Sequence, residues 1–508
     1  MSPYVSNLKP DACYLALKAR DARFDGSFFT GVTSTGIYCR PVCRVRTPKR
    51  ENCRFFGHAA QAESAGFRPC LRCRPELAPH SLSWSIQDAS AILAHQAARL
   101  LDEPEAWGET PASVAQLAAR LGVSDRHVRR IFEAQFGVSP VQYLQTRRLL
   151  TATQLLADTV LPVTQIALAS GFASVRRFNA AFLAHYGLNP TQLRRAGAQR
   201  NGPGLSVRLG WRPPYDVAAM LGFFNRRVLP GIEFVHGDGA AIGRTLSIES
   251  GGRLHRGWLV AQFDAAQHQL VLRVGDSLGE VLPLVIRRVR AAFDLDADPH
   301  AINRVLHARF PRCDGVRVPG ALSGFELAVR AVLGQQITVA AARTLAQRVV
   351  ERFGETIVTP FPELDRLFPE PAALARAGGD ALGQLGIVKQ RQAAIVAVAQ
   401  AVADKRLQLH GGADVQATLD QLQQLPGIGD WTAQYIAMRA LRWPDAFPSG
   451  DVALQKALGV QDSPSPARAA LAASQAWKPW RSYAVVRAWH ALPAPAAGQP
   501  AAPLQESS

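Results

Sequence analysis

The spacing of apolar residues changes twice along the chain and predicts two kinds of secondary structure. From Ile86 to about Leu193, apolar residues recur every three or four positions, which predicts helices. From Leu205 to Trp211, and again from Leu270 to Val274, every second residue is apolar, which predicts half-buried antiparallel strands. Beyond about Leu284 the helical spacing returns and continues to Leu492. We therefore expect a helical part, a sheet and a second helical part.

Segments without periodicity separate these parts. The first 79 residues are rich in Cys, Arg and Gly and end in a proline-containing stretch, and residues 194–204 combine Gly, Pro and charge as linkers do. The Pro- and Ala-rich end is expected to be a disordered tail. The expected domains are 1–79, 85–195, 205–318 and 319–492, followed by the tail 493–508.

The first helical part contains an internal repeat. Residues 114–118 are echoed by residues 163–167, and Gly122 is echoed by Gly171 at an offset of 49 residues. Each copy contains a helix, a glycine turn, a serine that can cap the next helix, and then that second helix. This order is typical of a helix-turn-helix, present here twice.

The second helix of each copy has an apolar face and an arginine-rich face. The apolar residues expected to pack in the core are Val128, Ile131, Phe132, Val175, Phe178 and Phe182. The arginines left on the outer surface, where a DNA major groove could receive them, are Arg126, Arg129, Arg130, Arg176 and Arg177. A charged helix face is usually only solvated, but its repetition in a basic protein favours DNA binding.

Composition and charge narrow the functional classes. The chain has 508 residues, with 57 Lys and Arg against 40 Asp and Glu, so its formal net charge is +17. Such a charge favours a polyanionic partner, nucleic acid or an anionic membrane, although it can also serve solubility alone. No stretch reaches the roughly 18 apolar residues of a membrane span, and the N-terminus lacks the apolar core of a signal peptide. We expect a cytoplasmic protein without a membrane partner.

The cysteine spacing predicts a metal site. Cys39 and Cys43 are separated by three residues, Cys70 and Cys73 by two, and the two pairs by 26. This paired spacing presents four thiolates to Zn²⁺, whose charge they exceed, so the sulfurs keep nucleophilic character. The basic residues around them are Arg40, Arg44, Arg46, Lys49, Arg50 and Arg54. Two readings stay open at this point: a nucleophile beside a phosphate-binding patch, or a zinc-stapled domain whose arginines only hold DNA.

A glycine turn and an aspartate form the second candidate site. Residues 425–429 (Leu-Pro-Gly-Ile-Gly) join two helical patterns, and Gly427 and Gly429 let backbone N–H groups approach a phosphate without reading sequence. Asp451 follows Phe-Pro-Ser-Gly where the N-cap of the next helix is expected. A plain cap is the simpler reading, but a carboxylate held ionised at a helix N-terminus can also serve chemistry.

The N-terminal part resembles the metal-binding domain of the Ada family of bacterial alkylation-response proteins. The resemblance is carried by residues 21–26 (Asp-Ala-Arg-Phe-Asp-Gly), 35–44 and 66–73. It implies that all four cysteines bind zinc and that Cys39 irreversibly takes the methyl group of a DNA methylphosphotriester. Methylation would remove one negative charge, so repulsion from the DNA backbone would fall. The affinity for DNA would then depend on whether Cys39 is methylated.

The repeated helix-turn-helix, with Gly171-Phe172 and the segment from Tyr186 to Pro190, resembles the DNA-binding domain of AraC-type regulators. The part from about 205 to 490 resembles helix-hairpin-helix DNA glycosylases, most closely the AlkA-like 3-methyladenine glycosylase II. The segments that carry this second resemblance are 211–216 (Trp-Arg-Pro-Pro-Tyr-Asp), 220–223, 334–336, 426–433 and 477–483.

The glycosylase resemblance assigns roles to particular residues. It implies that Asp451 is the catalytic carboxylate and that Trp431, Tyr435 and Trp489 line the base pocket. Trp431 also stands where lyase-competent relatives carry a lysine, so no Schiff base is expected and the glycosylase is monofunctional. Gln336 stands where the AlkA-like glycosylase inserts a leucine wedge into the DNA, and it is a less apolar wedge.

Two absences from the sequence narrow the assignment further. The chain has no cysteine after Cys313, which excludes the C-terminal iron–sulfur cluster of some relatives. It has no Pro-Cys-His-Arg stretch either, so the guanine-repairing half of full-length Ada is missing.

The sequence thus predicts a multidomain, mainly α protein with four folded parts. These are a small zinc-stapled domain, an all-α double helix-turn-helix, an α+β antiparallel-sheet domain and an all-α helix-hairpin-helix glycosylase domain. The expected function is bifunctional alkylation repair and response on alkylated and promoter DNA, with RNA polymerase as a further partner and a monomeric state. The alternative is a methylation-sensing activator whose glycosylase-like half only binds DNA. A small-molecule-responsive regulator is disfavoured because no segment is left to build a ligand domain.

Overall fold

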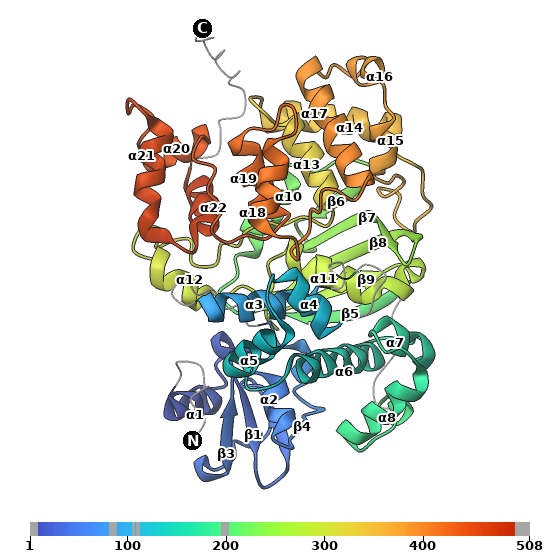
Figure 1. Ribbon diagram of the computed structural model, residues 1–508, viewed down its shortest axis with the longest axis vertical. Coiled ribbons are helices and arrows are strands. Elements are labelled where there is room, and N and C mark those ends of the chain that lie inside the picture. Colours follow the sequence, from blue (N-terminus) through green and yellow to red (C-terminus); the bar gives the residue numbers. More distant parts are fainter. Residues whose placement is uncertain (1–8, 81–88, 104–106, 108–111, 195–202, 493–508) are drawn as a thin grey trace. The chain divides into compact units, whose positions relative to one another are not determined.

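The computed structural model describes residues 9–80, 89–103, 107, 112–194 and 203–492 (Figure 1). Contacts divide the chain into two compact units. The first comprises residues 1–217, 235–301 and 357–365, and the second comprises 218–234, 302–356 and 366–508. Within the described residues, no helix is long and apolar enough to span a membrane. The predicted tail and most of the predicted linker, residues 195–202, lie outside the described residues.

Residues 9–80 form a small mixed sheet with short helices. The elements are α1 Pro10–Ala19, η1 Ala22–Phe24, β1 Phe29–Val32, β2 Ile37–Cys39, η2 Arg50–Asn52, β3 Cys53–Phe56, α2 Ala59–Ser64, β4 Arg68–Pro69 and η3 Pro75–Leu77. The strand order is β3-β1-β2-β4, with β2 and β4 parallel. Strand β2 ends at Cys39 and β4 ends directly before Cys70, so this parallel pair brings the two cysteine pairs together.

The described residues between 89 and 194 are mainly helical, as the apolar spacing predicts. The helices are α3 Ala89–Asp102, α4 Val114–Arg120, α5 Asp125–Phe136, α6 Pro140–Asp158, α7 Val163–Ala169, α8 Val175–Tyr186 and α9 Pro190–Arg194. The turns after α4 and α7 place Gly122 and Gly171 at φ +66° and +85°, where glycine is favoured. The side chains of Ser124 and Ser174 each accept a hydrogen bond from a backbone N–H of the following helix at 3.3 Å. The repeat is therefore two helix-turn-helices, α4–α5 and α7–α8. Arg194 ends α9 and does not begin a linker.

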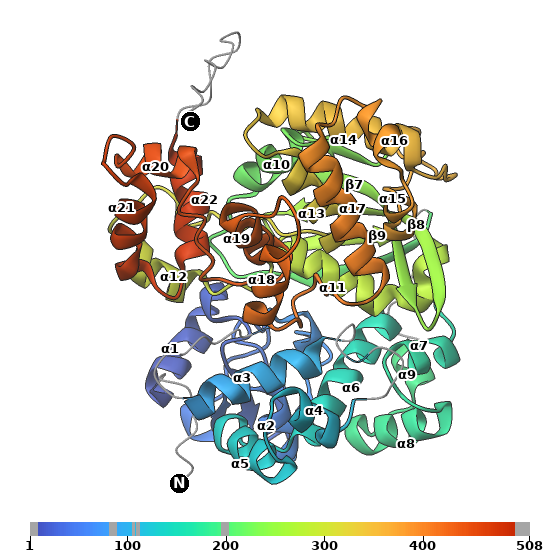
Figure 2. The ribbon, with the colours of Figure 1, turned by 45° about the horizontal axis from the view of Figure 1, so that its top comes forward.

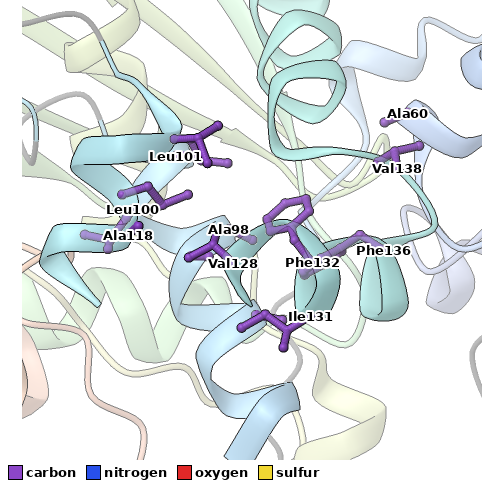
Figure 3. Packing of buried hydrophobic residues seen from close by; sticks show 14 of the residues in the cluster. Ala60, Ala98, Leu100, Leu101, Ala118, Val128, Ile131, Phe132, Phe136 and Val138 are labelled. Atoms are coloured by element: carbon purple, nitrogen blue, oxygen red, sulfur yellow. The ribbon is translucent and has the colours of Figure 1, made fainter. Parts of the chain in front are cut away.

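Apolar cores join the cysteine-rich segment to the helices. Helices α3, α4 and α5 lie side by side (Figure 2). Val128, Ile131 and Phe132 of α5 pack with residues of α3 and α4, and Ala60 of α2 belongs to the same cluster (Figure 3). Leu150 of α6 lies in a second cluster, with Tyr38 of β2 and other aromatic residues of the small sheet. In α8, Phe178 and Phe182 are fully buried, whereas Val175 stays partly exposed at the first turn of the helix.

Residues 203–292 contain the predicted antiparallel sheet. The elements are β5 Leu205–Gly210, α10 Val217–Asn225, β6 Glu233–His236, β7 Ala241–Ser250, β8 Arg253–Asp264, β9 Gln269–Val274, η5 Asp276–Val281 and α11 Leu282–Ala292. The strand order is β5-β9-β8-β7-β6, so β5 lies at one edge. Leu205 pairs with Val274 and Leu209 with Leu270, and all four are buried. Gly251 and Gly252, at φ +58° and +68°, form the predicted turn between β7 and β8.

The remaining residues are almost entirely helical. The elements are α12 Pro299–Leu306, α13 Gly324–Leu333, α14 Val339–Phe353, α15 Pro371–Ala375, α16 Gly379–Gly383, α17 Lys389–Ala403, α18 Val415–Gln423, α19 Asp430–Arg439, α20 Val452–Leu458, α21 Pro466–Ala473, η6 Ser474–Trp477 and α22 Arg481–Ala491. Helix α13 is buried along nearly all its length and contacts α14, α17 and α19. The second candidate site is built on α19, α20 and α22.

Candidate functional site

The four predicted metal ligands converge in the structure. The Sγ atoms of Cys39, Cys43, Cys70 and Cys73 all lie within 4.8 Å of one another, and only Cys73 is partly exposed. Sulfurs at about 2.3 Å from a tetrahedral Zn²⁺ would be about 3.8 Å apart, so the cluster needs little movement to close on the ion. A donor set made only of soft thiolates fits zinc and does not fit magnesium or calcium.

Hydrogen bonds within the cluster make two of the four thiols easier to ionise and the other two, Cys39 and Cys73, harder to ionise. Those with Cys39, Cys43 and Cys73 lower the pKa of Cys70, and those with Cys39 and Cys73 lower the pKa of Cys43 to about 7. The donated protons raise the pKa of Cys39 through its hydrogen bonds to Cys43 and Cys70. A bound cation would take the place of these protons and keep all four sulfurs ionised.

Arg40 does not belong to a phosphate-binding patch, which corrects the expectation from the sequence. Its guanidinium forms a buried ion pair with Asp25, with Nε donating to Oδ1 at 2.8 Å. Its backbone N–H donates to Sγ of Cys73 at 3.3 Å, and its Nη1 donates to the Cys73 carbonyl at 2.9 Å. Arg40 therefore supports the thiolate cluster from inside the domain.

The other basic residues near the cysteines remain accessible. Arg44, Arg46, Lys49 and Arg54 are exposed, and Arg50 is half-buried. The guanidinium carbon of Arg54 lies 5.3 Å from the ring centroid of Phe56, a distance at which a cation and a ring attract each other. The accessible positive charge therefore comes from the loop after Cys43 and from β3.

The helix-turn-helix arginines have the exposure that the sequence predicts. Arg126, Arg129 and Arg130 of α5 are exposed, and so are Arg176 and Arg177 at the start of α8. Arg130 lies 3.1 Å from Nδ1 of His127 one turn earlier. These side chains are free to meet a DNA groove, and their contacts with DNA stay a prediction.

The glycine turn between α18 and α19 has the geometry of a helical hairpin. Gly427 has φ +74°, and an added Cβ would lie 3.2 Å from the Cβ of Ala394 on α17. Gly429 has open space where its Cβ would be, so a phosphate could approach the N-terminus of α19. Gln335 was not predicted from the sequence: its Nε2 donates at 2.9 Å to the Gly427 carbonyl and at 2.9 Å to the Thr432 hydroxyl.

Asp451 caps α20 as predicted and is also bound by two indoles. Its Oδ1 accepts the Leu454 N–H at 2.7 Å and Nε1 of Trp489 at 3.0 Å, and its Oδ2 accepts Nε1 of Trp431 at 2.9 Å. The carboxylate is half-buried. Donors on both oxygens fix the plane of the carboxylate. Spacing along the chain gives no signal for these indole contacts.

The three predicted pocket aromatics lie together around Asp451. Trp431 and Tyr435 stack on α19, with ring centroids 5.3 Å apart and planes inclined by 12°. Trp489 of α22 lies 6.3 Å from Tyr435 with its plane tilted by 46°. All three side chains are partly exposed, so their ring faces are available for stacking on a planar ligand.

Two arginines lie beside Tyr435 in positions that the sequence did not indicate. Arg439, one turn further along α19, donates from Nη1 to the Tyr435 hydroxyl, and its guanidinium lies 4.8 Å from the ring centroid of Phe223. Arg227 lies 3.7 Å from the same ring. Burial alone would raise the pKa of Tyr435, but Arg439 and Arg227 outweigh it and hold that pKa below its ordinary value.

Gln336 is exposed and has φ +52°, a left-handed conformation that is uncommon for a residue with a side chain. It lies between α13 and α14, directly after the Gln335 that binds the hairpin. The structure therefore ties the predicted wedge residue to the glycine turn through the neighbouring side chain.

Comparison with known protein families agrees with this arrangement. The metal binding domain of Ada matches residues 12–76, and a helix-turn-helix domain matches residues 117–196. The AlkA N-terminal domain matches residues 206–323, and the HhH-GPD superfamily of base excision DNA repair proteins matches residues 329–482.

Curated proteins resemble the chain over its whole length and over its parts. A probable bifunctional transcriptional activator/DNA repair enzyme AlkA of Mycobacterium tuberculosis is 37% identical over 96% of this chain and 97% of its own length. The DNA-3-methyladenine glycosylase 2 of Escherichia coli is 35% identical over 56% of this chain and 96% of its own length. The bifunctional transcriptional activator/DNA repair enzyme Ada of Escherichia coli is 34% identical over 37% of this chain and 50% of its own length.

The fold and the two sites define a helix-hairpin-helix base excision repair protein preceded by an Ada-type metal-binding domain and a helix-turn-helix domain. More narrowly, the chain belongs to the family of AlkA-type bifunctional transcriptional activator/DNA repair enzymes.

The thiolate cluster yields a prediction about metal content. Purified protein is expected to hold an equimolar amount of zinc, and Cys70→Ser is expected to lose it during dialysis against a chelator, because one soft ligand is gone. Atomic emission spectroscopy measures the metal. Cys53→Ser, in the same domain but outside the cluster, serves as the control and should retain zinc. Equal retention in both variants would contradict a four-cysteine site.

The indole contacts yield a prediction about Trp489. Trp489→Phe keeps an aromatic ring and removes the N–H that binds Asp451. Losing a hydrogen bond to a charged group costs about 1.5–3 kcal/mol, so base release should slow by roughly 10- to 100-fold. Single-turnover release of base from alkylated DNA measures this. An unchanged rate would show that the indole acts only by stacking.

Proposed function

We propose that this chain is a monofunctional DNA glycosylase for alkylated purines, such as 3-methyladenine, joined to a zinc-dependent sensor of DNA methylphosphotriesters. The observation that carries the glycosylase half is the Asp451 carboxylate, which two pocket indoles hold from both sides. The sensor half rests on the convergence of four thiols in a domain that also carries exposed basic residues. Membership of the family supports both halves.

The proposed glycosylase site suits a cationic leaving group. A purine alkylated at N3 or N7 carries positive charge, so it stacks well on electron-rich rings and leaves easily. The base must be extruded from the duplex, and Trp431, Tyr435 and Trp489 would receive it. As the glycosidic bond breaks, positive charge develops on the sugar, and the Asp451 carboxylate would stabilise that charge and orient the attacking water. A hydroxyl replaces the base, and the base leaves with the bonding electrons.

The same residues explain why a glycosylase without lyase activity is proposed. Trp431, the second residue after the glycine turn, provides no amine, so no Schiff base with the sugar can form there. Gly427 and Gly429 would hold a phosphate, and Gln336 would fill the space left by the extruded base. Because glutamine is less apolar than leucine, we expect modest DNA affinity.

The proposed sensor step is a methyl transfer to Cys39. Bound zinc would keep the Cys39 sulfur ionised at neutral pH. The Sγ atom attacks the methyl carbon of the phosphotriester, the sulfur–carbon bond forms as the carbon–oxygen bond breaks, and the phosphodiester leaves as an anion. The cluster then carries one negative charge less, so the exposed arginines should bind DNA phosphates more tightly.

We extend the proposal to partners and organisation. Arg126, Arg129, Arg130, Arg176 and Arg177 would contact promoter DNA, and RNA polymerase would be recruited there, with the protein acting as a monomer. The working division is 1–79, 85–195, 205–318 and 319–492.

Asp451→Asn tests the glycosylase half. Asparagine can still cap α20, but it removes the charge and turns an N–H toward an indole donor. Base release should fall at least about 100-fold, as it does when electrostatic stabilisation of a transition state is lost. Release of 3-methyladenine from alkylated DNA is measured, with the exposed Asp462→Asn as control. Absent release in the wild type, or equal release by wild type and Asp451→Asn, would leave the activator whose second half only binds DNA.

Cys39→Ala tests the sensor half. Labelled methyl transfer from phosphotriester DNA should disappear in this variant, because the accepting sulfur is gone. Cys53→Ser should transfer methyl normally, and base release should be unaffected in both variants. Label retained in Cys39→Ala would refute Cys39 as acceptor.

A further inference from the structure

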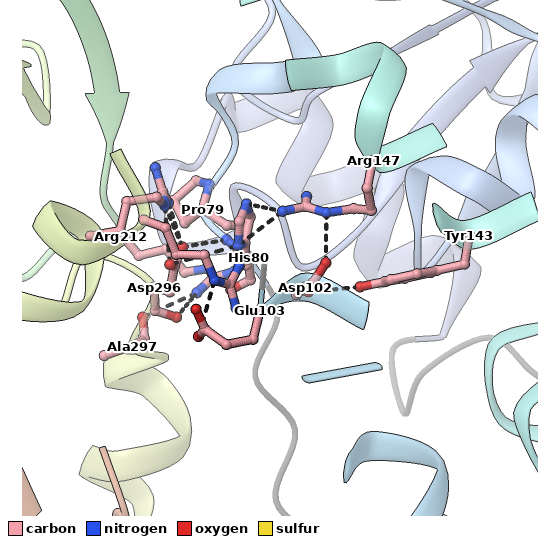
Figure 4. Close-up of polar contacts among 11 residues, drawn as sticks. Pro79, His80, Asp102, Glu103, Tyr143, Arg147, Arg212, Asp296 and Ala297 are labelled. Atoms are coloured by element: carbon pink, nitrogen blue, oxygen red, sulfur yellow. Dashed lines mark hydrogen bonds and ion pairs between the residues drawn. The ribbon is translucent and has the colours of Figure 1, made fainter. Parts of the chain in front are cut away.

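Arg212 lies at a buried meeting point of three segments of the first unit. Its side chain belongs to the Trp-Arg-Pro-Pro segment after β5 and is 1% exposed. Nε donates to the Asp25 carbonyl at 2.7 Å, and Nη2 donates to the Pro79 and His80 carbonyls at 3.1 and 2.8 Å (Figure 4). Nη1 donates to the carbonyls of Asp296 and Ala297 at 2.9 and 3.0 Å.

This guanidinium therefore uses its five N–H donors on main-chain oxygens. Three of those oxygens belong to the cysteine-rich segment and its end, and two belong to the segment after α11. Gly26 leaves room for the approach, since an added Cβ would lie 2.0 Å from the Pro79 carbonyl oxygen and 3.2 Å from Nη2 of Arg212. A smaller apolar side chain in place of Arg212 could not donate hydrogen bonds to these five carbonyl oxygens.

A second set of contacts extends the same interface to the helix-turn-helix part. The His80 N–H donates to Asp296 Oδ1 at 2.7 Å, and Arg290 of α11 donates to the same carboxylate. Arg147 of α6 approaches the His80 ring at 2.7 Å, as Figure 4 shows. Burial and the nearby Arg147 lower the pKa of His80 to about 3, so its ring is a neutral acceptor for Arg147.

One further contact crosses the same boundary, and another supports it from within the N-terminal half. Arg147 Nε also donates to Asp102 at 2.8 Å, which ties α6 to the end of α3. Glu103, which follows α3, pairs with Arg287 of α11 at 3.2 Å. Both Glu103 and the Arg287 side chain are largely removed from water, so this pair is no ordinary surface ion pair.

The free edge of the sheet is covered by the same helix α6. Strand β5 pairs with β9 on one side only. On the other side Gln154 Nε2 donates to the Arg208 carbonyl at 2.8 Å, and Asp158 Oδ2 accepts the Arg208 N–H at 3.2 Å. An open strand edge invites unwanted pairing, and here α6 satisfies both backbone groups of Arg208 on that edge.

The geometry points to a docking surface that binds another part of the same chain. Arg212, Arg287 and the outer edge of β5 on residues 203–301 bind this chain's own N-terminal half, residues 9–194. The cysteine-rich and helix-turn-helix parts are then attached to the sheet as one body and do not hang from a linker. This inference concerns attachment only and does not rest on either proposed activity.

Cleavage of the linker tests the docking surface. A site-specific protease sequence is placed within residues 195–202 of the full chain, and the folded protein is cut. The two halves should stay together in size-exclusion chromatography and analytical ultracentrifugation. Arg212→Met should weaken their association by roughly 30-fold or more, as expected for a truncated buried charge. Arg253→Met is the matched control, because the Arg253 side chain is 74% exposed in the same sheet, and it should leave the association unchanged.

A second variant separates docking from folding of the sheet part. Glu103→Ala combined with Gln154→Ala changes only the N-terminal half and removes contacts that cross the boundary. It should also weaken association by about 10-fold or more while circular dichroism of the uncut chain stays the same. Wild-type halves that separate on cutting would overturn the docking surface. So would an association equally tight in the wild type, Arg212→Met and the double variant.

Discussion

A charged side chain that leaves water must find hydrogen-bond partners inside the protein, and this constraint shapes each site of the molecule. In the cysteine-rich segment, Arg40 is buried and satisfied by Asp25 and by the Cys73 carbonyl. Its backbone N–H in turn binds a cluster sulfur. Arg40 therefore supports the cluster at Cys73, and the cations that remain available for a phosphate are those on the loop after Cys43 and on β3.

The same constraint makes the Asp451 carboxylate and the proposed base pocket one structure. Asp451 is satisfied by the first turn of α20 and by the indoles of Trp431 and Trp489. The donors that hold the carboxylate in place are thus on the rings that would receive the base. Any movement of a ring on binding would reposition the carboxylate, so binding and charge stabilisation are linked through two hydrogen bonds. Rigid placement of such a group is what electrostatic catalysis requires.

Features fixed by local periodicity or spacing could be predicted from the sequence. Residues of β5 and β9 pair as their alternation indicates, and α5 exposes the arginines that its apolar face leaves outside. The spacing of the four cysteines predicted that their thiolates would form one cluster. Contacts between residues far apart in the chain carry no such signal: Arg40 looked like one more surface cation, although Asp25 buries it. The Arg212 carbonyl contacts, the Gln335 bonds to the hairpin and the indole bonds to Asp451 depend on tertiary packing alone.

Asp25 belongs to two buried hydrogen-bond networks, that of Arg40 and that of Arg212. This double role determines how far a change in the charge of the four sulfurs affects the rest of the protein. Its carboxylate pairs with Arg40, and its carbonyl accepts from Arg212. Opposite charges in a buried pair cancel, so Arg40 and Asp25 can remain in place whether the neighbouring cluster carries more or less negative charge. The Arg40–Asp25 pair therefore responds little to the charge of the cluster. The loss of a thiolate charge acts mainly on the cations exposed at the surface. Arg44 and Arg46 are exposed there, and a polyanion bound to them would respond to the change as far as salt permits, since charge interactions in solvent are screened beyond roughly 8 Å.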